Sequence, residues 1–229
     1  MAVVVAGLAL FVCFLALGGW QVQRLAWKIH LIAQVDARVH AAAVPAPGPT
    51  RWAGVTRDKD QYRRVTVRGR FLHDKETLVQ AVTDAGGGFW VMTPLVDDRG
   101  FTVLINRGFV PAGRRDPAVR ADGQVEGQQT VTGLLRITEP KGGFLRANDP
   151  AGDRWRSRDV AAIARARGLT GAVAPYFVDA ERPPGRDPDG DLPVAGLTVI
   201  RFHNNHLIYA ITWFTLALMV AGGALTTTK

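Results

Sequence analysis

Residues 207–225 read LIYAITWFTLALMVAGGAL, an uncharged apolar run that decides the fold class of the chain. Residues 2–20 form a second such run, AVVVAGLALFVCFLALGGW. A helix rises about 1.5 Å per residue, so about 20 apolar residues cross a hydrocarbon core about 30 Å thick. We therefore expect a transmembrane helix at each end of the chain, and one domain between them that is attached to the bilayer through both of its ends.

The first run has a second interpretation, as a cleaved export signal. It lacks a basic leader and a clear small-x-small cleavage site before Trp20, so a retained helix is favoured. In the second run, Tyr209 and Trp213 lie near the polar end, as amphipathic rings do at a headgroup layer. The second run is therefore the stronger prediction of a membrane span.

Every charged side chain except Lys229 lies between the two runs, and the whole chain carries a net charge of +8. The positive-inside rule describes short loops, so it does not fix the side of the membrane on which this long segment lies. Its arginines are spread out, without a lysine-rich stripe or interleaved aromatic residues, which argues against nucleic acid as a partner. A basic surface beside anionic membrane lipid is the favoured interpretation.

The scarcity of two residue types excludes several classes of site. The one cysteine, Cys13, lies inside the first apolar run, so the central segment can form neither a disulfide nor a thiolate metal site. Ser157 is the one serine, and its Arg-Ser-Arg setting cannot form the G-x-S-x-G turn of a serine hydrolase. No H-E-x-x-H or P-loop motif occurs. We therefore expect a protein that is not an enzyme.

The central segment alternates apolar and polar residues in the manner of strands, with one alanine-rich helix. The helix is expected at residues 160–167, with Asp159 as its N-cap and Gly168 at its end. The strands are expected at 64–71, 77–82, 89–96, 101–110, 130–138, 176–179 and 197–202. The sequence predicts an α+β membrane protein in which two terminal helices flank one β-rich, antiparallel, barrel-like extracytoplasmic domain with a short helix.

These elements divide the chain into four parts. We expect a first transmembrane helix at residues 1–23 and a second at 204–226, with a β-rich periplasmic domain at 62–203. Residues 24–61 are expected to be a helical extension over 29–39 followed by a linker that prolines interrupt.

Three motifs suggest sites, and each has a simpler explanation. Gly86-Gly87-Gly88 is not followed by the lysine or hydroxyl of a phosphate-binding loop, so a hairpin loop is favoured. Asp187, Asp189 and Asp191 alternate like calcium ligands but lack a glutamate at the twelfth position, which favours a solvated turn. The third motif, formed by residues 58, 60 and 62 (Asp, Asp and Tyr), is interpreted as an exposed part of the linker.

A histidine at the start of the second apolar run is the strongest candidate for binding. On a helix, His206, Ala210, Trp213 and Ala217 share one face, which would place an imidazole above small residues and a flat ring. That arrangement suits a planar apolar ligand, and a neutral imidazole is a common axial ligand of haem iron.

Near the end of the first run, Trp20, Arg24 and Trp27 share a face with Lys28 beside it, so a ring and cations could meet the carboxylates of the same ligand. The alternative is that both groups of residues are interfacial anchors, with tryptophan among the headgroups and arginine reaching the phosphates.

Three blocks resemble the surfeit locus protein 1 family. They are WQVQRLAWK at 20–28, FWVMTPLVDDRGFTVLINRGFVP at 89–111 and NNHLIYAITWF at 204–214. The resemblance implies an assembly factor for haem-copper oxidases, chiefly cytochrome c oxidase, with its large loop in the periplasm or intermembrane space. It also implies that His206 is the ligand of haem a, with His203 a weaker candidate. Asn106-Arg107-Gly108 lies in the central block, and we interpret it as a strand end where glycine permits a strained turn.

The leading hypothesis is an assembly factor that holds or hands over haem a, with His206 as the axial iron ligand and Trp20, Arg24, Lys28 and Trp213 lining the site. Its expected partners are the catalytic subunit of the oxidase, haem a synthase and membrane lipid. Without an arginine-rich leader, a bacterial cytoplasmic membrane is expected, with the main domain in the periplasm. The alternative is a structural chaperone that stabilises an oxidase subunit without binding haem.

Overall fold

A computed structural model describes residues 2–84, 86–143, 146–183, 185, 192–198 and 204–227. Two compact units make up the chain. The first combines Met1–Asp36 with Ile200–Lys229 and is called here the helical pair. The second is Ala37–Val199 and is called the barrel domain.

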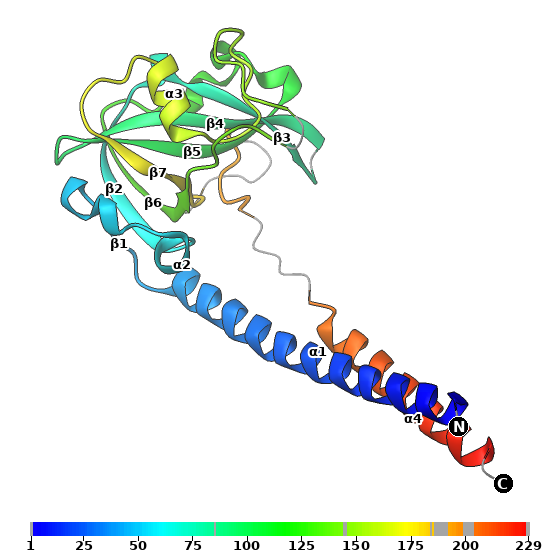
Figure 1. The fold of residues 1–229 in the computed structure, drawn as a ribbon. Helices are drawn as coiled ribbons and strands as arrows, with labels where there is room; N and C mark the ends of the chain where they lie inside the picture. Colours follow the sequence, from blue (N-terminus) through cyan, green and yellow to red (C-terminus); the bar gives the residue numbers. More distant parts are fainter. Residues whose placement is uncertain are drawn as a thin grey trace. The chain divides into compact units, whose positions relative to one another are not determined.

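The helical pair consists of α1 (Ala2–His40) and α4 (His206–Thr227), drawn blue and orange to red in Figure 1. Both are long and apolar enough to cross a membrane. The predicted extension of the first helix is confirmed, because α1 continues without a break to His40. Arg38 and His40 are basic residues in its last turn, where positive charge interacts favourably with the negative end of the helix dipole.

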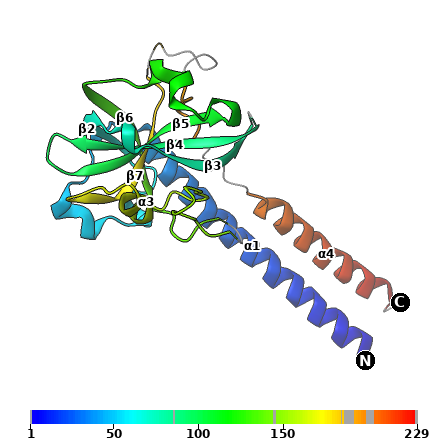
Figure 2. The same cartoon turned by 90° about the horizontal axis from the view of Figure 1, so that it is seen from above.

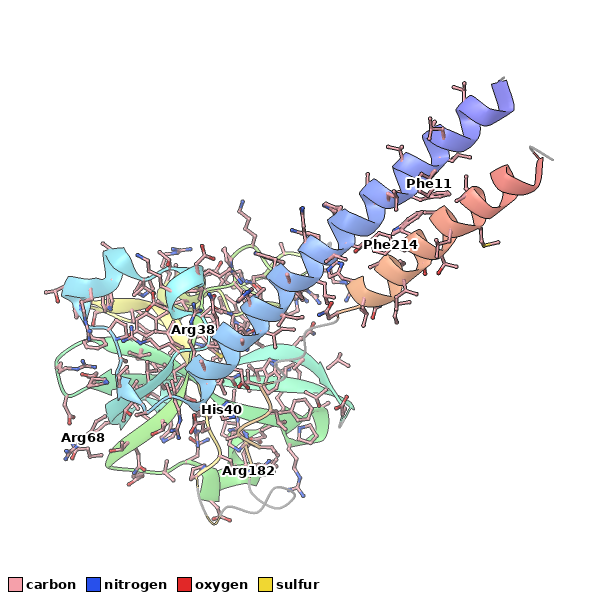
Figure 3. The ribbon with its side chains drawn as sticks, turned by 90° about the horizontal axis from the view of Figure 1, so that it is seen from below. Phe11, Arg38, His40, Arg68, Arg182 and Phe214 are labelled. Carbon is pink, nitrogen blue, oxygen red and sulfur yellow. The ribbon has the colours of Figure 1, made fainter. Side chains whose placement is uncertain are left out.

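Small residues and aromatic rings pack α1 against α4. A Cβ atom added to Gly18 would lie 2.7 to 2.9 Å from ring atoms of Phe214, so the absence of a side chain permits this approach. Phe14 stacks on Trp213 with ring centroids 5.7 Å apart. Figure 3 draws Phe11 and Phe214 in the space between the two helices.

The barrel domain is a curled seven-stranded sheet that closes on itself (Figures 1 and 2). A pairing between β2 and β4 closes the five strands β2, β6, β7, β5 and β4 into a barrel, with β1 and β3 as outer strands. The strands are β1 (Val44–Pro45), β2 (Arg64–Phe71), β3 (Thr77–Thr83), β4 (Gly86–Asp97), β5 (Thr102–Pro111), β6 (Gln128–Ile137) and β7 (Val173–Ala180). The predicted fold class is confirmed, and the one addition within the closed barrel is a parallel pairing of β5 with β7.

Alternating side chains divide β4, β5 and β7 between two apolar clusters. Ile105 and Tyr176 belong to a cluster to which every strand of the closed barrel contributes. Leu104 and Phe177, one position away, belong to a second cluster with Ile163 of α3 (Val160–Ala166). Helix α3 therefore covers the other face of β5 and β7, and both faces of these strands are buried.

The predicted turns and caps are also confirmed. Gly100 has a φ of 86° in the turn between β4 and β5, where its amide donates to the carbonyl oxygen of Asp97. The Asp159 carboxylate accepts a hydrogen bond from Ala162 N at the start of α3, and Gly168 has a φ of 58° just after its end.

Asn106-Arg107-Gly108 lies inside β5, so its interpretation as a strand end is wrong. The register between β4 and β5 shifts there, as in a β-bulge, because Trp90 faces Phe109 whereas Met92 faces Asn106. The need for glycine is nevertheless real. Gly108 has a φ of 130°, and a Cβ atom at this position would lie 2.2 Å from the carbonyl oxygen of Val194.

Two other interpretations are corrected. Gly86-Gly87-Gly88 was expected to be a hairpin loop. It forms the first residues of β4 and pairs with the end of β3. The expected linker contains a 3₁₀ helix at Pro49–Gly54 and a helical turn, α2, at Arg57–Asp60. Asp60 is only 6% exposed, because its carboxylate accepts hydrogen bonds from Thr56 N and Arg63.

Three predictions fall outside the described residues. These concern the second half of the expected strand 197–202, the three aspartates at 187, 189 and 191, and His203. Leu197 and Thr198 are described and are not in a strand.

Candidate functional site

His206 is the first residue of α4, and its ring contacts the other helix of the pair. The Nδ1 atom lies 2.7 Å from Oε1 of Gln21 in α1. An amide oxygen can only accept a hydrogen bond, so Nδ1 carries the proton and donates it. The lone pair of the imidazole is then on Nε2, the atom available for a metal ion.

Gln21 was not among the residues predicted from the sequence. It comes directly after the first apolar run and is only 8% exposed. A buried amide is costly in an apolar environment unless it is hydrogen-bonded, and intramembrane polar residues commonly have a functional role. The signal was present in the sequence as a polar residue at the edge of an apolar run, but the partner is 185 positions away.

The expected stripe on the second helix exists, and it faces α1. Ala210 and Ala217 are 3% and 1% exposed, and Trp213 stacks on Phe14. The flat surface that we expected to receive a planar ligand is therefore the contact surface between the helices. Of the four residues in the stripe, His206 lies at the polar end, where α4 begins.

The predicted cations lie on α1 beyond the level of Gln21. Arg24 and Lys28 follow it by three and seven residues, or about 4.5 Å and 10 Å along the helix axis. The Arg24 guanidinium lies 4.8 Å from the centroid of the Trp27 ring. Trp20 and Trp27 are 51% and 53% exposed, so neither is buried in the contact between the helices. Lys28 is half-buried.

The barrel domain contains a charged cluster that the sequence did not reveal. Asp179 in β7 is 3% exposed and accepts hydrogen bonds from Asn106 at 2.8 Å and Arg136 at 2.6 Å. Arg158 also bonds to Asp179 and to Glu139. Burial alone would lower the pKa of Arg158, but these two carboxylates outweigh it and raise the pKa above its ordinary value.

This charged cluster ties β5, β6 and β7 together and has the character of a structural network. Among the described residues, no group of three or more histidine, cysteine, aspartate or glutamate side chains could hold a metal ion.

Comparison with known proteins decides the relationship that the three sequence blocks suggested. The SURF1 family model matches residues 8–218. The chain belongs to the SURF1 family. Surfeit locus protein 1 of Homo sapiens is 40% identical over 219 residues, which cover 88% of this chain and 69% of the relative.

Two further relatives agree with membership of the SURF1 family. Surfeit locus protein 1 of Mus musculus is 39% identical over 217 residues, covering 87% of this chain and 67% of the relative. The SURF1-like protein of Monosiga brevicollis is 36% identical over 213 residues, covering 88% and 78%. The matched region includes Gln21 and His206, so both members of the hydrogen-bonded pair lie within the SURF1 part of the chain.

Proposed function

We propose that this SURF1-family protein is an assembly factor for a haem-copper terminal oxidase, and that it holds haem a for transfer to the catalytic subunit. The observation that carries the proposal is the hydrogen bond between Gln21 and His206, which places the lone pair of the imidazole on Nε2, the atom that would bind iron. Family membership supports the assembly role. The proposed role is to bind and transfer a cofactor, which is not an enzymatic activity.

The residues of the helical pair fit haem a as a cargo. Haem a, when bound, would supply an iron that accepts a nitrogen ligand, a flat apolar ring and carboxylates that favour cations. His206 offers the nitrogen, and Arg24 and Lys28 offer positive charge near the same end of the pair. Trp20 is half-exposed and offers an apolar ring toward the surroundings.

Trp213 contributes indirectly in this proposal. Its ring stacks on Phe14, so it holds α4 against α1 and thereby keeps His206 level with Gln21. Transfer of the cargo requires only moderate affinity, because a carrier has to release what it binds.

A second candidate function is a membrane chaperone that stabilises an oxidase subunit without contacting haem. The exposed apolar surfaces of both helices favour it, since Leu8, Ile208 and Leu218 are each more than 60% exposed within the pair. Lipid covers such surfaces equally well, and this candidate gives the hydrogen bond between the buried Gln21 and the half-buried His206 no task beyond helix packing.

The proposed function is tested by deleting the gene in an organism that makes a haem a oxidase. We expect membranes that still contain the oxidase polypeptides but have lost most of the haem a absorbance and the oxidase activity. The chain with His206→Ala should fail to restore both, and the unaltered chain should restore them. Loss of the polypeptides together with the haem would favour the chaperone, and an unchanged spectrum would refute both candidates.

We further propose that the membrane is the bacterial cytoplasmic membrane, with the barrel domain in the periplasm. The two candidate spans and the family resemblance support this topology. Alkaline phosphatase inserted in the segment Pro117–Gly123 should be active, since it folds only outside the cytoplasm. If that fusion is inactive, and a cytoplasmic fluorescent reporter inserted at the same site is fluorescent, the barrel domain lies in the cytoplasm and the proposed topology is wrong.

A further inference from the structure

Gln21 is a buried polar side chain of α1, and it makes a hydrogen bond to His206 of α4. It lies about one helical turn from Gly18, where α1 and α4 approach so closely that there is no room for a side chain. Its oxygen accepts the Nδ1 proton at 2.7 Å. Packing alone does not call for a polar residue at position 21, because an apolar side chain of similar size would fill the same space without the cost of burying an amide.

The chemistry of this bond restricts the imidazole to one form. A neutral imidazole has two tautomers, and the bond that one nitrogen makes decides which nitrogen keeps a lone pair. Histidines that bind metals commonly donate their other ring N–H to such an acceptor, which orients the ring and strengthens the ligand.

We infer that Gln21 is a positioning residue that fixes the Nδ1-protonated tautomer and the ring plane of His206, so that Nε2 presents its lone pair to the iron of haem. The inference rests on the proposed function for its haem-binding part. Its tautomer part concerns the free chain and stands on the geometry of the pair.

A purely structural role for Gln21 gives different expectations. Interhelical hydrogen bonds between polar side chains also hold membrane helices together. A residue that served only this purpose would change the stability of the pair and leave the tautomer and iron affinity to other causes. The readouts must therefore be the state of the ring and the affinity for haem.

The first experiment is ¹⁵N NMR of the full chain in detergent, without haem, after selective labelling of its histidines. At pH 8 an ordinary imidazole is neutral, and its protonated and unprotonated nitrogens have well-separated shifts. The His206 signals, assigned from their loss in His206→Ala, should show protonated Nδ1 alone. Gln21→Leu should give a mixture of tautomers, and Gln21→Glu should keep one tautomer because it retains an acceptor oxygen.

The second experiment measures haem affinity of the same full-length chains by absorbance titration. Gln21→Leu should weaken binding about 10 to 100-fold, as happens when a residue that orients a metal-binding histidine is removed, and Gln21→Glu should restore most of it. The matched control is Gln23→Leu, which removes an exposed glutamine two residues away and should change neither readout.

The outcomes separate the inference from the proposed function. If His206→Ala abolishes haem binding while Gln21→Leu changes neither tautomer nor affinity, the inference is wrong and the proposed function stands. If the unaltered chain shows mixed tautomers, the inference is also wrong. If it shows one tautomer but binds no haem, the proposed function fails, and the role toward iron fails with it.

Discussion

Tyr176 is a fully buried residue of the barrel whose hydroxyl donates a 2.6 Å hydrogen bond to the carbonyl oxygen of Pro47. Burial raises the pKa of the phenol above its ordinary value of 10.0. Above about pH 10 the unfolded chain therefore loses a proton that the folded chain keeps, so the stability of the barrel falls as the pH rises. Below that pH the contribution of Tyr176 is fully present.

Tyr176→Phe should lower the free energy of unfolding by about 1 kcal/mol at pH 7, since it removes one hydrogen bond while Pro47 O keeps its bond from Trp52. It should also reduce the loss of stability between pH 9 and pH 11, which brackets the ordinary pKa of about 10. Denaturant unfolding of the full chain in detergent, followed by tryptophan fluorescence, measures both effects. An alkaline slope equal to that of the unaltered chain would contradict this account.

At the residue scale, some positions could be singled out from the sequence and others could not. His206 could be singled out because an imidazole at the start of an apolar helix is unusual. Gln21 and Asp179 could not, because their partners are distant in the sequence. A buried polar residue looks the same in a sequence as a solvated one until its partner is known.

At the scale of elements, the packing of α1 on α4 depends on the missing side chain of Gly18. Gly18→Leu should force apart the helices or displace the Phe214 ring, at a cost of about 1 to 3 kcal/mol to their association. Gly19→Leu is the matched control, because a Cβ atom at Gly19 meets nothing within 4 Å.

The separation of the helices can be followed by electron paramagnetic resonance with nitroxide labels at Leu15 and Ile211, which are both exposed. The native Cys13 is first replaced by alanine, because it would also take a label. Gly18→Leu should lengthen or broaden the distance between the labels, and Gly19→Leu should not. Equal effects of the two changes on the distance between the labels would contradict the proposal that the missing side chain of Gly18 permits the close approach of α1 and α4.

Strands β2 to β7 were predictable because their alternation is local, and the turn at Gly100 because glycine follows a polar run between two apolar segments. The bulge at Asn106-Arg107-Gly108 was not predictable as a bulge. Its geometry is set by a bond from Asn106 to Asp179 in β7 and by the close approach of Val194 to Gly108. Both are tertiary contacts that no pattern within β5 contains.

At the scale of the whole molecule, the two apolar ends predicted the membrane helices and the region between them predicted a barrel-like domain. The parallel pairing of β5 with β7 was beyond the sequence, because antiparallel neighbours cannot be distinguished from parallel ones by alternation. The pairing of His206 with Gln21 is of the same kind, since it joins the two ends of the chain. The proposed site therefore exists only in the folded molecule.

The most direct test of the proposed haem site is the absorbance of the full chain purified from a host that makes haem a. We predict a haem a spectrum for the unaltered chain, and a loss of about ten-fold or more in bound haem for His206→Ala, because removal of an axial ligand leaves only ring and carboxylate contacts. His30→Ala, which removes an exposed histidine of α1, should keep its haem. Full haem loading of a correctly folded His206→Ala chain would contradict the assignment of His206 as the iron ligand.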